Sequence, residues 1–295
     1  MAPDPAFSVR SRGNLVALLA VVLVIAAVVT VWRYAAGEPP HRLTLTVVEG
    51  TVQVAGPTGV RDGAQGVVLR NDDRVATGEG GRAVLSLGAE TEIRLGPVSS
   101  VQVRSIDEDG VRLELENGAL QATVRTESGA VRVGNRGREV VATNSDFSMG
   151  VRGGVLKVKA ERGDLSISGA DVTRIVEGMQ ANIVDRHAEL GPVPEALLLR
   201  VEWPRSDRTS GDVATVAGRT APGSSVRVEG KSGTVLVEAD EAGRFTAEVV
   251  LVEGANAARV VATDPIGDEA TAQGPLPTRD TSGPTFTTDV EYVEP

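Results

Sequence analysis

An uninterrupted apolar run near the N-terminus constrains the fold of this chain more than any other feature. Residues 15–31, LVALLAVVLVIAAVVTV, are apolar except for Thr30. With Trp32 the run has about 18 residues, which as an α-helix would span about 27 Å, close to the thickness of a bilayer's hydrocarbon core. A helix that packs on a globular core is amphipathic, whereas this run is apolar on every side. The sequence therefore predicts a transmembrane helix over residues 14–34.

A cleaved signal peptide is the alternative interpretation of this run. The apolar region of a signal peptide is usually only about 7 to 15 residues long, and Ala35 and Gly37 make a weak cleavage site. Trp32 and Tyr34 suit the membrane interface, where amphipathic rings settle. We therefore expect an uncleaved anchor that includes Leu15, Leu19, Leu23, Val28 and Trp32. Residues 1–13 would be a short cytoplasmic tail, and everything after the helix would lie in the periplasm of a single-pass inner-membrane protein.

The composition argues against several classes of function. The formal net charge is -10, which argues against nucleic acid as a partner because phosphate contacts need clustered Lys and Arg. The chain has no cysteine, so it has no disulfide, no thiolate nucleophile and no cysteine-linked lipid. Its two histidines, His41 and His187, have no acidic or serine motif around them. We therefore expect no enzyme activity, no cofactor and no metal ion.

Two acidic clusters could bind a cation, but turns explain them better. Asp72 and Asp73 are adjacent, and adjacent side chains in a strand point to opposite faces. Residues 107–110, DEDG, end in glycine, as strand connections commonly do. We interpret both clusters as turns, with calcium binding as the alternative.

Residues 43–190 have the pattern of short β-strands separated by glycine. Alternating apolar residues begin with LTLTV at residues 43–47. A weak repeat, Gly-x-apolar-x-apolar, starts at Gly50, Gly118, Gly129, Gly154 and Gly163. Glycine supplies the positive φ that a tight turn needs, and alternate apolar side chains point to one interior. The pattern predicts an all-β domain, a sandwich or a short β-solenoid, with a core of Val, Leu, Ile and Ala because only 3% of residues are aromatic.

Several ordered motifs in this region resemble the FecR-type domain of bacterial envelope proteins. That family shows a Gly-Asp-x-Val-x-Thr segment, an Arg-Ala-x-Leu-x-Leu strand, a later strand and turn, and a Val-Arg-Gly-Thr segment. The matching residues here are Asp73, Val75, Thr77, Arg82, Ala83, Leu85, Gly118, Val151, Arg152 and Gly153. The resemblance runs from residue 46 to about residue 190. It implies a β-solenoid-like exterior domain and, in the best-known members, transmembrane signalling.

Residues 195–275 have the pattern of a second β domain. Short alternating runs are separated by turn signals such as Pro222-Gly223, which favours a β-sandwich. Asp240, Gly243 and Phe245 belong to an Asp-x-x-Gly-x-Phe segment that resembles bacterial immunoglobulin-like modules. Residues 276–295 are rich in Pro, Thr and Asp and are expected to be disordered, although residues 290–293 could pair with a sheet edge.

These features favour a non-enzymatic binding, scaffold or sensing module of the cell envelope, with an envelope protein or glycan as its unknown partner. Regulation of a sigma factor is one alternative. Signalling FecR proteins carry a helical anti-sigma domain before the membrane helix, whereas the thirteen or so residues here are too few to bury a core. Binding to peptidoglycan or another polysaccharide is a further alternative. The basic residues that could form such a patch, or else a solvated face with interleaved acids, are Arg125, Arg132, Arg136, Arg138 and Arg152.

Overall fold

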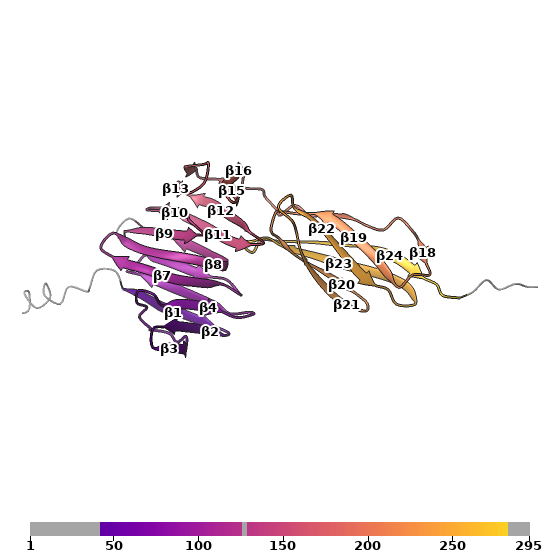
Figure 1. Cartoon of the computed structure of the whole chain (residues 1–295), viewed down its shortest axis with the longest axis horizontal. Coiled ribbons are helices and arrows are strands. Elements are labelled where there is room, and N and C mark those ends of the chain that lie inside the picture. Colours follow the sequence, from indigo (N-terminus) through magenta and orange to yellow (C-terminus); the bar gives the residue numbers. More distant parts are fainter. Residues whose placement is uncertain (1–41, 126–128, 283–295) are drawn as a thin grey trace, which may run out of the picture. The chain divides into compact units, whose positions relative to one another are not determined.

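The structure, a computed structural model, describes residues 42–125 and 129–282. The regular elements in these ranges are β-strands (Figure 1), so the all-β prediction is confirmed for them. Within the same ranges, no helix has the length and apolar character needed to cross a membrane. The predicted anchor, residues 14–34, and the predicted tail, residues 1–13, lie outside the described residues.

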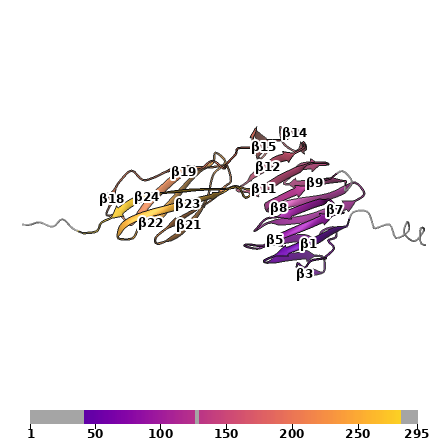
Figure 2. The same cartoon turned by 180° about the vertical axis from the view of Figure 1, so that it is seen from behind.

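The first module, residues 43–192, consists of two sheets. Sheet A contains, in spatial order, β1 (Leu43–Glu49), β5 (Arg82–Leu87), β6 (Thr91–Leu95), β8 (Gly110–Thr123), β11 (Asp146–Arg152), β12 (Val155–Arg162), β15 (Met179–Val184) and β16 (His187–Pro192). Sheet B contains β3 (Gly59–Asp62), β2 (Val52–Gly56), β4 (Arg74–Thr77), β7 (Ser100–Asp107), β8, β9 (Ala130–Asn135), β10 (Arg138–Ala142), β13 (Leu165–Ser168) and β14 (Arg174–Ile175). Figures 1 and 2 show the strands stacked from β3 at one end of the module to β15 at the other.

The strand β8 joins the two sheets by changing partners at Gly118. Its first half pairs with β7 and β9 in sheet B, and its second half pairs with β6 and β11 in sheet A. Gly118 has φ +82°, and a Cβ there would lie 2.5 Å from the Cα of Ser99. The other repeat glycines, Gly50, Gly129, Gly154 and Gly163, also have positive φ but lie outside the strands. Gly118 differs because it bends a continuous strand.

The sequence allowed either a sandwich or a short β-solenoid, and the pairing of the strands favours the sandwich. Among the described strands of the first module, all pairs are antiparallel except β8 with β9, whereas the rungs of a parallel β-solenoid would stack in parallel. Side chains from both sheets form one core of Val, Leu, Ile and Ala, in which Phe147 is the aromatic member. This composition follows from the scarcity of aromatic residues and from the alternation of buried and exposed positions along each strand.

The second module, residues 200–282, has its own two sheets and its own core. One sheet contains β17 (Arg200–Glu202), β19 (Val213–Arg219) and β22 (Arg244–Val250). The other contains β18 (Arg208–Thr209), β24 (Glu269–Arg279), β23 (Gly254–Thr263), β20 (Ser225–Gly230) and β21 (Gly233–Glu238). Phe245, Val216 and Val260 lie in the shared core, and Trp203 packs against it. The module is a β-sandwich; its resemblance to immunoglobulin-like modules stays a prediction.

The predicted disordered tail begins too early. Strand β24 continues to Arg279, and Leu276 is buried in the second core with 5% of its surface exposed. The prolines at 275 and 277 are tolerated because this part of β24 pairs with β23 on one side, while β18 meets β24 only at Thr278 and Arg279. The remainder of the predicted tail from residue 283, including residues 290–293, lies outside the described residues.

Candidate functional site

Most of the FecR-type motif residues serve the fold of the first module. Val75, Ala83 and Leu85 are buried in its core, while Arg82 is exposed at the start of β5. The Thr77 hydroxyl donates a hydrogen bond to the Gly96 carbonyl at 2.6 Å and accepts one from the Ser99 amide at 2.9 Å. These bonds hold β4 beside the turn that leads into β7.

The two acidic clusters lie in turns, as predicted. The Asp73 carboxylate accepts a hydrogen bond from the Arg70 amide at 2.9 Å and pairs with Arg61 at 3.5 Å. In the second cluster, the Asp107 carboxylate accepts a hydrogen bond from the Asp109 amide at 3.1 Å, and Gly110 has φ +125°. In the part of the chain that the structure describes, no group of three or more acidic or histidine residues is arranged to hold a metal ion.

The five arginines considered for a glycan patch do not share one surface. Arg138 is buried, and its guanidinium donates hydrogen bonds to Asn135 and to the Ile183 carbonyl. Burial, and then the charge of Arg136, lower the pKa of Arg138. Arg125 pairs with Asp146 at 2.7 Å, and Arg152 turns toward the second module. The arrangement therefore gives no support to a basic glycan site.

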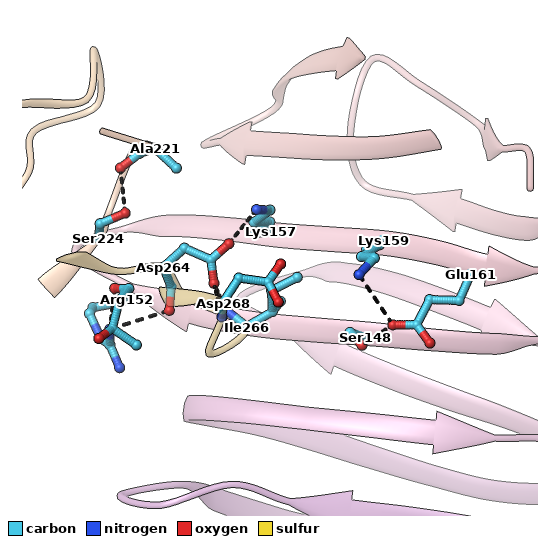
Figure 3. Close-up of polar contacts among 11 residues, drawn as sticks. Ser148, Arg152, Lys157, Lys159, Glu161, Ala221, Ser224, Asp264, Ile266 and Asp268 are labelled. Carbon is cyan, nitrogen blue, oxygen red and sulfur yellow. Dashed lines mark hydrogen bonds and ion pairs between the residues drawn. The ribbon is translucent and has the colours of Figure 1, made fainter. Parts of the chain in front are cut away.

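The Val151-Arg152-Gly153 segment is the motif that reaches the second module. It lies where β11 turns into β12. Arg152 Nη1 donates a hydrogen bond to the Thr263 carbonyl at 3.1 Å and a longer one to the Asp264 carbonyl at 3.4 Å; Figure 3 shows Arg152 beside Asp264. Just before it, Gly150 lies against the turn between β23 and β24. A Cβ at Gly150 would come well under 3.0 Å from the Pro265 carbonyl oxygen. Glycine is therefore required there for the two backbones to approach.

A buried ion pair is the centre of this junction. Lys157 Nζ, on β12, donates to the Asp264 carboxylate, and the two side chains are only 3% and 0% exposed (Figure 3). The other carboxylate oxygen of Asp264 accepts hydrogen bonds from the amides of Ile266 and Asp268, at 3.1 and 2.9 Å. Two charges removed from water must satisfy each other and their remaining hydrogen bonds. The geometry therefore favours one particular docking of the modules.

The Asp-x-x-Gly-x-Phe segment, residues 240–245, forms the turn on the opposite wall of the junction. Asp240 Oδ1 accepts hydrogen bonds from the Ala242 and Arg244 amides at 2.9 and 2.8 Å. Gly243, with φ +74°, leaves no room for a Cβ beside the Thr220 carbonyl. Phe245 follows, buried in the second core. These contacts fix residues 240–243 against residue 220.

Between the modules lies a groove formed by two adjoining cavities of about 590 and 500 Å³. The β15–β16 hairpin lines one wall, and residues 219–222 and 241–242 line the other. Both cavities share Asn182, Glu189, Pro222 and Glu241. No local pattern marks this site, because its residues come from strands and turns far apart in the chain, and the turn motifs that contain Pro222 and Glu241 indicate only a fold.

The groove contains buried polar atoms that have no hydrogen-bond partner among the described residues. They are Gln180 Oε1, Asn182 Oδ1 and Thr220 Oγ1, and each of these residues lines the larger cavity. Buried polar atoms are nearly always hydrogen-bonded in folded proteins, to protein or to ordered water. Their position makes the groove the best candidate for a binding site.

At one end of the groove, Asp171 holds the β16 strand by a pH-dependent contact. The Ala188 amide donates to Asp171 at 2.8 Å, and His187 Nδ1 lies 2.9 Å from the same carboxylate. The amide hydrogen bond first, and then the His187 contact, lower the pKa of Asp171. A carboxyl whose pKa is lower in the folded state contributes stability above its unfolded pKa of about 3.9, and this contribution is lost as the pH falls through the folded pKa.

We therefore expect an NMR titration from pH 7 to pH 2 to show the Ala188 amide resonance shifting with a midpoint below about pH 3.9. Asp171→Asn should abolish this titration because it removes the ionisable group. A midpoint at or above the ordinary value would contradict the contact.

Comparison with known proteins assigns the class of the first module. Residues 73–170 match the FecR protein family, so the chain carries a FecR domain and the resemblance found in its motifs is confirmed. Two crystal structures of a "putative anti-sigma factor" from Parabacteroides distasonis, at 1.65 and 2.50 Å resolution, are similar to this chain. In each, identity is 16%, the TM-score is 0.36, and the aligned region covers 41% of this chain and 59% of that chain. A search of curated proteins gave no match.

Proposed function

We propose that this chain is a non-enzymatic FecR-domain protein that binds an envelope partner in the periplasm while residues 14–34 anchor it to the inner membrane. The FecR match over residues 73–170 is the observation that carries the proposal. The apolar run at residues 15–31 supports the anchor, since its length suits a bilayer. The groove supports a binding role because it combines volume with unsatisfied polar atoms.

The buried junction adds a physical reason for a binding or scaffold role. A flexible linker alone would let the two sandwiches move independently. The Lys157–Asp264 pair and the close approach at Gly150 instead favour one arrangement of the walls of the groove. A preformed groove loses less entropy when its ligand binds.

Topology is tested with the full-length chain carrying a C-terminal tag, in intact spheroplasts. We expect added protease to digest the β modules and alkaline carbonate to leave the anchored protein in the membrane fraction. Leu19→Arg with Leu23→Arg should reduce membrane retention, because each arginine costs about 2.5 to 3.5 kcal/mol at the centre of a membrane helix. Leu19→Ile with Leu23→Ile is the matched control. Protected modules, or a wild-type chain that carbonate extracts, would overturn the proposal.

Sensing that ends in regulation of transcription is the second candidate function. The FecR match favours it because the best-known members of that family signal across a membrane. Its test compares transcripts in cells that express the full chain with cells that express residues 1–42 alone. A changed set of transcripts supports signalling, whereas identical transcripts, together with a partner cross-linked to the β modules in living cells, support binding or scaffolding.

A further inference from the structure

We propose that the groove between the modules binds an extended peptide segment of a partner protein, with a basic side chain of the peptide between Glu189 and Glu241. The inference rests on the proposed binding function and names the chemistry of its ligand. The groove combines carboxylates from both walls, arginines and apolar side chains in its larger cavity, and buried polar atoms without a hydrogen-bond partner among the described residues.

The acidic end of the groove is formed by both modules. Glu189 comes from β16, and Glu241 comes from the turn before β22, so the two residues line the groove from opposite walls. Within the two described ranges, neither carboxylate forms an ion pair with a basic side chain. Asp185 and Arg186 line the same end, which therefore has three carboxylates and one guanidinium. An ammonium or guanidinium group placed there would meet carboxylates from both sides.

The unpartnered oxygen atoms on the walls of the groove can also accept hydrogen bonds from an ammonium or guanidinium group. Gln180 Oε1 and Asn182 Oδ1 are acceptors, and they lie on the β15 strand beside Glu189. Thr220 is only 5% exposed, and its hydroxyl oxygen has no partner among the described residues. A ligand rich in N–H donors satisfies these oxygens, and a lysine or arginine side chain provides such donors together with the positive charge.

The remainder of the groove suits a peptide better than a sugar. Leu190 and Leu198, which are 42% and 65% exposed, line the larger cavity with Leu197 and Pro194. Arg200 and Arg219 lie along the same cavity and offer positive charge to an acidic side chain of the ligand. No Phe, Tyr or Trp side chain, on which a sugar ring could stack, is among the described residues that line the two cavities. Apolar contacts together with charged groups of both signs match an extended peptide with mixed side chains.

Ligand binding is also coupled to the junction. One wall belongs to each module, and the Lys157–Asp264 pair lies where those walls meet, with Lys157 itself lining the larger cavity. A peptide that contacts both walls stabilises the docked arrangement, and a docked arrangement in turn raises the affinity for the peptide. Binding of a peptide in the groove should therefore reduce the motion of the two modules relative to each other.

The test uses the full-length chain in detergent micelles and a phage-displayed library of random dodecapeptides. We expect selected peptides to carry Arg or Lys within an extended sequence of mixed polar and apolar residues. Synthetic copies should bind the Glu189→Gln, Glu241→Gln double variant about tenfold or more weakly, because hydrogen bonds to charged groups are the strong ones. Glu248→Gln, at an exposed position of β22 outside the groove, is the matched control and should bind normally.

A second variant separates binding from folding. Thr220→Val removes a buried hydroxyl that has no partner, so it should leave the unfolding midpoint unchanged or raise it, yet weaken the peptide severalfold. Failure to select any peptide, absence of basic residues, or indifference to the groove variants would each overturn the inference. Cross-linking to a partner in living cells that survives the double variant would leave the proposed function intact while excluding this groove as its site.

Discussion

Replacement of Asp264 by alanine is expected to separate the unfolding of the two modules. The change leaves the Lys157 ammonium buried without its counter-charge, and it removes the acceptor of the Ile266 and Asp268 amides. An uncompensated buried charge costs about 3 to 5 kcal/mol. Lys157 is only 2% exposed in the docked arrangement and regains full hydration when the modules separate. The loss should therefore appear first as undocking and then as independent unfolding of the second module.

Urea denaturation of the full chain in a Trp32→Phe background measures this effect. Trp203 is then the single tryptophan, and it packs against the second core, so its fluorescence reports that module alone. Circular dichroism reports both modules. In Asp264→Ala we expect the fluorescence transition to move to lower urea than in the unaltered background. Unchanged urea midpoints in Asp264→Ala would contradict the role of the ion pair.

Two further variants apportion the energy of the pair. Lys157→Met should be milder than Asp264→Ala, because Asp264 keeps two amide hydrogen bonds in the turn. Lys157→Met combined with Asp264→Asn should recover most of the loss, since it removes both charges and keeps an acceptor for those amides. A double variant as unstable as the sum of the single ones would show that the two side chains do not act as a pair.

Replacement of Gly118 by alanine is expected to prevent folding of the first module. The residue has φ +82°, where a side chain costs about 1 to 2 kcal/mol. The added Cβ would also lie 2.5 Å from the Ser99 Cα and 2.6 Å from the Val98 carbonyl oxygen, and backbone atoms cannot move aside cheaply. The total should exceed about 4 kcal/mol, a loss found only where a specific steric or electrostatic conflict arises.

Gly154 is the matched control because it has the same φ, +82°, with no atom within 4 Å of its added Cβ. Gly154→Ala should therefore lower the free energy of unfolding only by the conformational cost of about 1 to 2 kcal/mol. Far-ultraviolet circular dichroism during urea denaturation compares the two variants. Equal losses of unfolding free energy in Gly118→Ala and Gly154→Ala would mean that the close approach of β8 to Ser99 adds nothing to the effect of Gly118→Ala.

Much of the β structure was predictable because its signals are local. Alternation of apolar residues and positive-φ glycines mark strands and turns within a few residues, as at Gly129 and Gly163. The strand runs of the second module were identified in this way, whereas the FecR domain was identified by the resemblance of its ordered motifs to a known family. The last strand was missed because residues 275–277, Pro-Leu-Pro, look like a break, although a partly unpaired position tolerates proline while Leu276 fills the core.

The junction and the groove could not be predicted in the same way. Lys157 alternates with core residues of β12 and reads as an ordinary solvated side chain, and Asp264 reads as a turn residue before proline. Nothing within either segment indicates that the two are partners 107 positions apart. Gly150 likewise gives no sign that the Pro265 carbonyl occupies the space of its missing side chain.

By itself the sequence was sufficient for the all-β character of the described chain, because periodicity and turn chemistry act between near neighbours. It was also sufficient for the FecR domain, because the ordered motifs of that domain resemble those of a known family. It also predicts a membrane anchor, which awaits the topology experiment. The change of partners along β8, the buried ion pair and the groove arose only when distant strands came together. Contacts of that kind depend on shape and burial in three dimensions, and a single sequence carries no local pattern for them.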